Sequence, residues 1–278
     1  MDIGDYYSKA FKGFTDNPNL AIPTLVGTVL INVMIFIVAM VSFLIFLGPE
    51  LLNNGSISPD TINYGSIATV LILAALVVII TGIIYSFIYA STIGMSKRII
   101  EGEKPELNIG LKYGKKYLVK IFLVSIIIAI LFILASIPII AGIILDYTYG
   151  LVFILTIIGF LISLILYIVI AMIFIFTYQS IVVCKKSVMS VFKDSINVFK
   201  KRRFEVLVVL IINGLIIGCI NIGLLLIGAF LGLIPLIGSL LNVLITIVVN
   251  TLVLPYFTMV LTYLYMDIKG MEIREYID

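Results

Sequence analysis

Long apolar runs separated by short polar stretches dominate the sequence from end to end. Runs almost free of Lys, Arg, Asp and Glu cover approximately residues 21–47, 65–95, 120–145, 150–181, 205–233 and 238–265. A helix rises about 1.5 Å per residue, so about 20 apolar residues cross the roughly 30 Å hydrocarbon core of a bilayer. The pattern therefore predicts six transmembrane helices, which pair as three hairpins. The first run lacks the cleavage pattern of a secretory signal, and we expect it to be retained as a span.

Shorter amphipathic stretches precede the first and the fifth apolar runs. In each, apolar or small side chains recur at i, i+3, i+4, i+7, i+8 and i+11, the spacing of one helix face. The first stripe is Ile3, Tyr6, Tyr7, Ala10, Phe11 and Phe14, and the second is Val188, Val191, Phe192, Ser195, Ile196 and Phe199. Lys193 and Asp194 are predicted to lie off the second stripe.

The stretch before the third run fits the same template less well, because Lys115 interrupts its stripe. That stripe comprises Leu107, Gly110, Leu111, Gly114 and Leu118. We predict an all-α integral membrane protein of three hairpins, each preceded by an amphipathic segment that lies in the cytoplasmic interface.

The same stretches indicate an internal repeat. The triplets Ala10-Phe11-Lys12, Gly110-Leu111-Lys112 and Val191-Phe192-Lys193 are separated by 100 and 81 residues, about one amphipathic segment plus one hairpin. We interpret residues 1–278 as a single membrane domain with repeats at 1–95, 96–183 and 184–266 and a cytoplasmic tail at 267–278. The alternative is that any three-hairpin membrane protein with basic cytoplasmic loops shows this pattern without duplication.

Composition excludes a soluble fold, and the distribution of charge orients the spans. Hydrophobic residues make up 62% of the chain and charged residues 12%, about half the charged fraction of a soluble domain. All 18 Lys and Arg residues lie in the terminal segments and in the second and fourth loops, whereas the other face receives Glu50, Asp60 and Asp146. Because cytoplasmic loops retain Lys and Arg during insertion, both termini are predicted to be cytoplasmic in a cell membrane.

The basic residues are the predicted lipid contacts. Beside an apolar span, such side chains keep their charges in the headgroup layer while their stems lie against acyl chains. The predicted headgroup contacts are Lys12, Lys112, Lys115, Lys116, Lys193, Lys200, Lys201, Arg202 and Arg203. The partners would be membrane lipids, anionic on the cytoplasmic side. Nucleic acid is disfavoured because no aromatic stacking platform accompanies the cations. The alternative is that the amphipathic helices form a collar around the bundle without binding a ligand.

The spans lack the residues that most membrane enzymes and ion-coupled transporters require. The chain contains no His, and its carboxylates lie in loops or at span ends. We therefore predict no catalytic, cofactor or metal site, and a protein that is not an enzyme. Cys184 and Cys219 show no CxxC spacing and are expected to be free thiols.

Small and neutral polar residues are the candidates for contacts within the membrane. The predicted polar contacts are Asn213, Asn221, Asn242 and Asn250, and the predicted packing residues are Gly214, Gly218, Gly228, Gly232 and Pro255. Gly214 and Gly218, like Gly228 and Gly232, form GxxxG pairs that allow a close helix approach. Asn221 and Asn250 lie at similar distances from the turn near Pro235, so their amides are predicted to meet. The alternative is that the amides line a polar pocket. Pro255 is expected to kink its helix.

The lengths of the runs predict inclined helices. The fourth run continues for about 32 residues without a charge, about 48 Å of helix, which exceeds the bilayer core by half. Such helices tilt or protrude. Splayed helices would leave lipid-filled crevices between hairpins, whereas simple tilt in a compact bundle is the alternative.

Two segments resemble a known group of membrane proteins. They are YYSKAFKGFTDNPNLAIP near the start and SVMSVFKDSINVFKKRRFEVLVV later in the chain. They are similar to prokaryotic membrane proteins of unknown function, and to the membrane domain attached to some glycerophosphodiester phosphodiesterases. The resemblance implies a membrane location and dealings with lipids. It transfers no catalytic residue, because the soluble phosphodiesterase domain is missing from this sequence.

The sequence as a whole favours a non-enzymatic multi-pass membrane protein that handles lipids or hydrophobic molecules, or that shapes the cytoplasmic leaflet. One alternative is a transporter or channel for a small neutral solute, lined by the asparagines of the fifth and sixth spans. Another is a membrane anchor or assembly subunit for a soluble cytoplasmic partner or for further copies of itself.

Overall fold

The computed structural model describes residues 2–53, 64–150, 153–234 and 237–274, and the long elements in these ranges are helices. The elements are α1 (Ile3–Asp16), η1 (Pro18–Ala21), α2 (Ile22–Asn53), α3 (Tyr64–Ile100), α4 (Leu107–Ala135), α5 (Ile137–Tyr149), α6 (Ile154–Phe174), α7 (Thr177–Val183), α8 (Val188–Lys201), α9 (Arg203–Leu231) and α10 (Ile237–Ile268). Within these described ranges, six helical segments are long and apolar enough to cross a membrane, as predicted.

Two short capped helices, α1 and α8, precede long apolar ones. Asp2 caps α1 together with Asp5, and Ser187 caps α8 together with Ser190, each pair forming a reciprocal capping box. The stretch before the third predicted span is different, since it is the first part of the continuous helix α4. A separate third amphipathic helix is therefore absent from the described residues.

Two of the predicted spans are interrupted. The helix axis breaks at Ser136 between α4 and α5, where Pro138 removes a backbone donor. Ser136 Oγ lies 3.0 Å from the carbonyl oxygen of Phe132 and 2.5 Å from the hydroxyl of Tyr167 on α6. The fourth run divides into α6 and α7, so its excess length is taken up by a break as well as by protrusion.

The break between α6 and α7 is held by a side chain from α8. Ser195 Oγ donates to the carbonyl oxygen of Ile173 at 2.7 Å and accepts from the backbone N–H of Phe176 at 3.3 Å. Both backbone groups would otherwise lose a partner where the helix stops. Helix α8 therefore stabilises the interruption of the preceding long apolar run.

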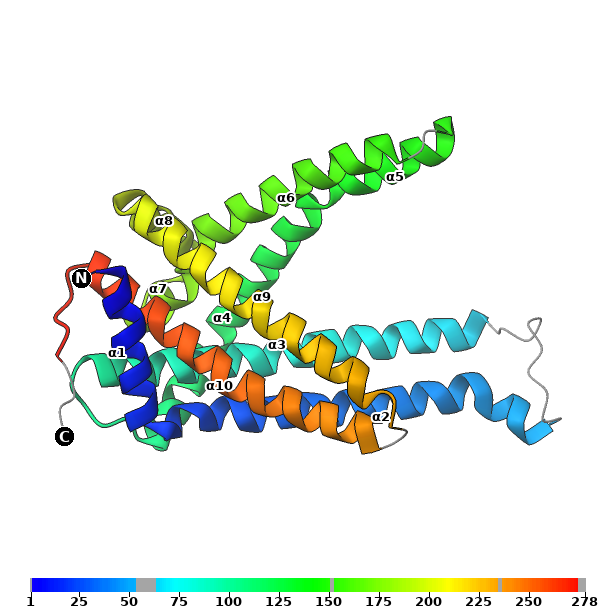
Figure 1. Ribbon diagram of the computed structural model, residues 1–278, viewed down its shortest axis with the longest axis horizontal. Helices are drawn as coiled ribbons and strands as arrows, with labels where there is room; N and C mark the ends of the chain where they lie inside the picture. The colour runs from blue at the N-terminus through cyan, green and yellow to red at the C-terminus, as the bar shows by residue number, and fades with distance from the viewer. Residues whose placement is uncertain (1, 54–63, 151–152, 235–236, 275–278) are drawn as a thin grey trace.

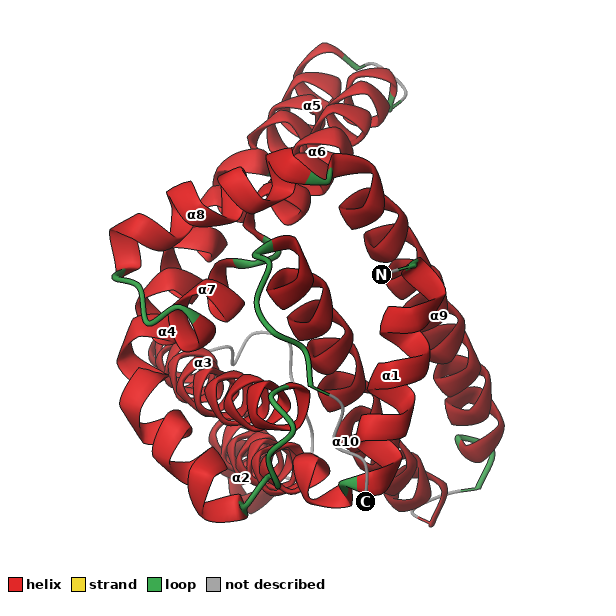
Figure 2. Cartoon of the chain, turned by 90° about the vertical axis from the view of Figure 1, so that its left-hand side faces the viewer, coloured by secondary structure: helices red, strands yellow, loops and turns green. Residues whose placement is uncertain are grey.

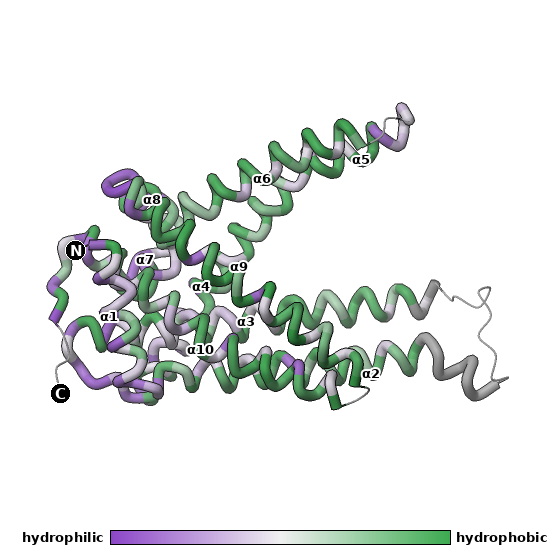
Figure 3. The backbone as a smooth tube through the Cα atoms, in the orientation of Figure 1, coloured by the Kyte–Doolittle hydropathy of each residue, from purple (hydrophilic) through white to green (hydrophobic). Residues whose placement is uncertain are grey.

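The hydrophobic core lies at one end of the molecule. Its residues come from α1, α7 and α8, from the end of α3, from the first part of α4, and from the ends of α9 and α10 nearest to these helices. We call this region the head. Helix α1 and the end of α10 lie there (Figure 1), and hydrophilic residues along the described backbone are concentrated there (Figure 3).

Among the described residues, the long helices beyond the head lie in pairs. They are α2 with α3, α5 with α6, and α9 with α10, and we call them the three arms. The α5–α6 arm diverges from the α2–α3 arm (Figure 1), and a view onto the head places the arms on different sides of the molecule (Figure 2). Large exposed apolar side chains are concentrated in the arms. Such surfaces are typical of helices surrounded by hydrocarbon.

Two glycines allow the backbones of α5 and α6 to approach closely along the α5–α6 arm. A Cβ atom at Gly159 would lie 2.3 Å from the carbonyl oxygen of Pro138, and one at Gly142 would lie 2.5 Å from the carbonyl oxygen of Leu155. Because backbone atoms are the obstacle, the two helices approach closely only without side chains at these positions. Near the tip of the arm, Asp146 accepts hydrogen bonds from the backbone N–H groups of Leu155 (3.1 Å) and Thr156 (2.8 Å).

Candidate functional site

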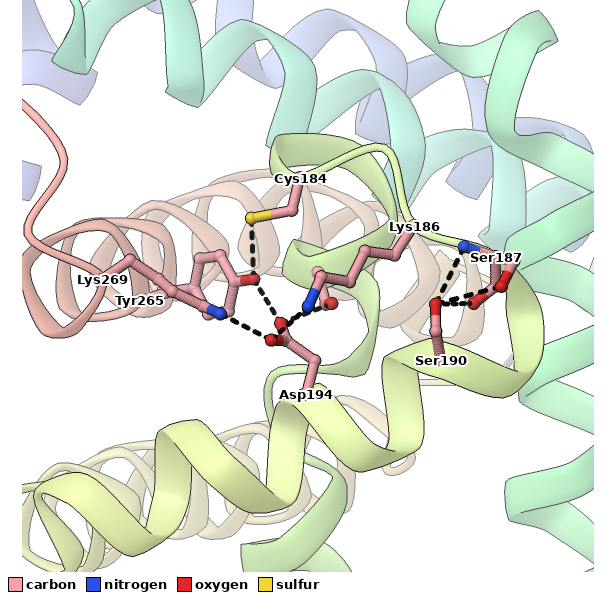
Figure 4. Close-up of polar contacts among 8 residues, drawn as sticks. Cys184, Lys186, Ser187, Ser190, Asp194, Tyr265 and Lys269 are labelled. Carbon is pink, nitrogen blue, oxygen red and sulfur yellow. Dashed lines mark hydrogen bonds and ion pairs between the residues drawn. The ribbon is translucent and has the colours of Figure 1, made fainter.

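A buried carboxylate, Asp194 of α8, organises the polar interior of the head (Figure 4). Its side chain is 4% exposed. Lys186 and Lys269 each place Nζ 2.5 Å from Oδ1, whereas Ser180 and Tyr265 donate from 2.7 Å to Oδ2. The prediction that Asp194 lies off the buried stripe is therefore wrong, because α7 and α10 cover this face of α8 and supply the partners.

The surroundings of Asp194 favour its charged form. Burial alone would raise the pKa of the carboxyl group, but the hydrogen bonds from its four donors outweigh that cost and hold the pKa well below the usual aspartate range. Two ammonium groups face one carboxylate, so the cluster is cationic at neutral pH. It joins the segment after α7, the middle of α8 and the end of α10.

The cluster continues to a cysteine. The hydroxyl of Tyr265 lies 3.1 Å from Sγ of Cys184. Cys184 and Cys219 are both free thiols, as expected, and Cys219 is exposed on α9.

A second ion pair joins the start of α9 to the end of α10. Arg202 Nη1 donates to Asp267 Oδ2 at 2.7 Å and to Glu205 Oε2 at 3.3 Å. Tyr6 of α1 donates to the same oxygen of Asp267 at 2.7 Å. Arg202 was predicted to contact headgroups, but the structure turns it toward these carboxylates. It therefore attaches α1 and the α8–α9 junction to α10.

The other predicted headgroup contacts are exposed on the head. They are Lys12, Lys112, Lys115, Lys116, Lys193, Lys200, Lys201 and Arg203. They lie on α1, on the first turns of α4, and on α8 with the start of α9. Lys116 also lies over the ring of Tyr117, with Nζ 5.3 Å from the ring centroid.

The four predicted asparagine contacts have different environments. Asn213 is buried, and its Oδ1 lies 2.7 Å from the hydroxyl of Tyr7 on α1. Asn242 lies against Gly228 across the α9–α10 arm. Asn221 is exposed and donates to the carbonyl oxygen of Ile217 on its own helix, at 2.9 Å, and Asn250 is also exposed. The predicted pairing of Asn221 with Asn250 is wrong in the described structure. Two side chains at the same depth in a hairpin need not point toward each other around their helix axes.

The tyrosine that contacts Asn213 is a firm hydrogen-bond donor. Burial is the main cause that raises the pKa of Tyr7, and the nearby Tyr256 is the second; together they raise it to about 12. The hydroxyl therefore keeps its proton at neutral pH, and it also lies 3.2 Å from the carbonyl oxygen of Val209. This contact joins α1 to α9 near the head.

The glycines of α9 pack less closely than predicted. A Cβ atom at Gly214 or Gly218 would meet no described atom within 4 Å, so neither brings a helix close in the described structure. A Cβ atom at Gly228 would lie 3.2 Å from the amide of Asn242, and the nearest atoms to Gly232 belong to its own turn. Pro255 lies inside α10 and is buried. The kink expected there stays a prediction.

Close glycine packing occurs instead between α3 and α4. A Cβ atom at Gly110 would lie 2.6 Å from the sulfur of Met95, and one at Gly114 would lie 2.4 Å from Oγ of Ser91. The stripe around Lys115, predicted to be interfacial, is thus partly covered by α3. The stretch GLKYG has the GxxxG spacing, which was the available signal.

Apolar grooves open beside the head. One has a volume of about 370 Å³ and is lined by α2, α3 and α4, and another of about 430 Å³ is lined by α1, α9 and α10. A polar pocket of about 230 Å³ lies between α1, α3 and α10 and includes Lys9, Lys12 and Asp16. Within the described ranges, no group of three or more His, Cys, Asp or Glu side chains is placed to hold a metal ion.

Residues 1–268 match a protein family described as a domain of unknown function (DUF7847). The chain belongs to this family. The match extends from α1 to the end of α10, so it includes the head and all three arms. No curated protein and no solved structure significantly matches the chain.

The buried residues of the head are the main features that the sequence interpretation missed. Asp194 follows Val191 by three residues and precedes Val198 by four, so it shares a helix face with two buried residues. That spacing could have identified it. Lys269 and Asp267 gave no comparable signal, because their partners are far away in sequence.

Proposed function

We propose that this protein handles lipids or other hydrophobic molecules at the cytoplasmic leaflet of a cell membrane, without catalysing a reaction. Both termini and the head face the cytoplasm in this proposal. The carrying observation is that exposed cations cover the head while apolar grooves open directly beside it. A phospholipid needs both surfaces, since its headgroup is polar and its chains are apolar.

The arrangement of the short helices supports the proposal. We infer that α1 and α8 lie in the interface, as amphipathic segments before the first and third hairpins. Their apolar faces cover the head core, and several Lys side chains on their other faces remain exposed. A cationic interface attracts anionic headgroups with about 1 kcal/mol for each Lys or Arg near the surface. We include in the proposal the resemblance to phosphodiesterase-associated membrane domains that the two quoted sequence segments suggest, since it implies a role toward lipids.

Lipid movement in vesicles tests this function. The purified protein would be reconstituted into vesicles of phosphatidylcholine and phosphatidylglycerol, and the movement of a fluorescent lipid would be followed between leaflets and between vesicles. Wild type is expected to accelerate one of these movements. A variant with Lys200→Gln, Lys201→Gln and Arg203→Gln is expected to be slower, because headgroup attraction is reduced.

The matched control keeps the charge and changes only the side chains, with Lys200→Arg, Lys201→Arg and Arg203→Lys. It is expected to behave like wild type. Arg202 is left unchanged because it pairs with Asp267. Absence of any lipid movement in correctly reconstituted wild type would reject the proposal. Flux of a small neutral solute without lipid movement would instead support a transporter.

A further inference from the structure

The groove between α2, α3 and α4 has the form of a binding site for one lipid chain. Its floor is α3, and its walls are α2 and α4. The side chains around it are all apolar and include Val26, Leu30, Ile84, Phe87, Leu111 and Leu118. Its volume of about 370 Å³ lies in the range of roughly 300–1,000 Å³ typical of small-molecule sites.

The depth of the groove is set by close contacts on both sides of α3. On the α2 side, a Cβ atom at Gly27 would lie 2.4 Å from Cδ1 of Ile88. On the α4 side, one at Gly114 would lie 2.5 Å from the ring of Phe87. The two walls are therefore held against the floor, and the groove is part of the packed structure.

One wall carries positive charge beside the apolar surface. Leu111, Lys115 and Leu118 are spaced i, i+4 and i+7 on α4, which places them on one helix face. Lys115 is exposed, while both leucines line the groove. Lys112 and Lys116 are the nearest further cations along the helix. Lys112 and Lys116 are separated by about 6 Å of helix rise, which is comparable to one headgroup layer of a bilayer.

We propose that this groove binds a single anionic phospholipid, with an acyl chain against Leu118, Ile84 and Leu30 and the headgroup at Lys115. The inference rests on the proposed function, because it requires α4 to enter the bilayer from the headgroup layer. The α4 side of the groove runs from Leu107 to Leu118, about 16 Å of helix, and Leu118 lies about one turn beyond Lys115 toward the apolar part of α4. In this arrangement the charged headgroup lies beside Lys115, and the acyl chain lies against the apolar side chains deeper in the bilayer.

The absence of Trp from the chain allows a clean fluorescence test. Leu111→Trp places a reporter in the groove, and Ile133→Trp places a second reporter about 20 Å farther along α4 than Lys120, outside the groove lining, at a position that is 66% exposed. Each variant would be reconstituted with phospholipids that carry brominated chains, which quench Trp on contact. Brominated phosphatidylglycerol and brominated phosphatidylcholine would be compared at equal mole fraction.

The position-111 reporter is expected to show an approximately fivefold preference for phosphatidylglycerol, the factor that corresponds to about 1 kcal/mol from one lysine. The position-133 reporter is expected to show a preference close to one, because no Lys or Arg lies within three turns of it on α4. Adding Lys115→Gln should remove most of the preference at position 111, whereas adding Lys193→Gln on α8 should leave it unchanged. Elution as a single species and an unchanged melting temperature would show that the variants fold.

Equal quenching by the two lipids at position 111 would overturn the proposal. The proposal would also be overturned if the Trp at position 111 were unquenched and became quenched only when the protein is diluted in the membrane. A second copy of the chain would then occupy the groove. The outcome is separable from that of the lipid-movement assay. Selective quenching without lipid movement would reject the proposed function and keep the site, and the reverse result would reject the site alone.

Discussion

Removing the charge of Asp194 should destabilise the head more than any other substitution of similar size that we propose in it. Asp194→Asn keeps the size of the side chain but leaves Lys186 and Lys269 together without a counter-charge. Both ammonium groups lie 2.5 Å from the same oxygen, Oδ1. Removing one partner of a fully buried ion pair costs about 3–5 kcal/mol. The lysine side chains are 34% and 21% exposed, so water recovers part of that cost, and we expect about 2–3 kcal/mol.

The assay is thermal and denaturant unfolding of the purified protein in detergent at neutral pH. Lys193→Gln is the matched control, because Lys193 neighbours Asp194 on α8 and is exposed. Its effect should stay within about 0.5 kcal/mol. A triple variant of Asp194→Asn with Lys186→Met and Lys269→Met should recover much of the loss, since it leaves no uncompensated cation.

The pH dependence gives an independent measurement. The folded pKa of Asp194 is depressed, so its stabilising contribution is fully present above the unfolded pKa of about 3.9 and is lost as pH falls toward the folded pKa. Asp194→Asn should therefore show a weaker loss of stability than wild type below about pH 4. Equal stabilities of Asp194→Asn and Lys193→Gln at neutral pH would refute the reasoning.

Three further substitutions test contacts that join pairs of helices. Tyr7→Phe leaves the buried oxygen of Asn213 without its 2.7 Å donor, which should lower the free energy of unfolding by about 1–2 kcal/mol; an unchanged melting temperature would contradict the contact. Gly159→Val places a Cβ about 2.3 Å from the carbonyl oxygen of Pro138, so it should cost about 1–3 kcal/mol and slow cysteine crosslinking across the α5–α6 arm. Asp146→Ala leaves two backbone N–H groups at the start of α6 without their acceptor and should lower the melting temperature in the same unfolding assay; an unchanged melting temperature would count against this cap.

The six long helices could be predicted because hydrocarbon requires continuous apolar sequence and internally paired backbone. Their interruptions were less accessible. The stretch around Ile175 is as apolar as the helix before it, and the break there depends on Ser195, which arrives from another helix. Similarly, helical spacing places Asn221 and Asn250 at one depth but does not determine which way each amide faces.

The polar centre of the head was unpredictable for a related reason. Asp194 is separated from Tyr265 by 71 residues and from Lys269 by 75, so its partners are brought together only by the packing of α8 on α10. The face that Asp194 occupies could be derived from its spacing to Val191. Its charge state could not, because that depends on the donors supplied by the other helices.

The glycine contacts between α5 and α6 determine where this arm can bend. Along its length, the backbones touch at Gly142 and Gly159, and the tip is tied by Asp146. At its base, the chain is interrupted on both sides, at Ser136 and next to Phe176. The arm is therefore a closely packed unit between two interruptions, and the one next to Phe176 is hydrogen-bonded to Ser195 of α8. A displacement of the arm would therefore reach α8 first, one residue away from Asp194 and its two lysine partners.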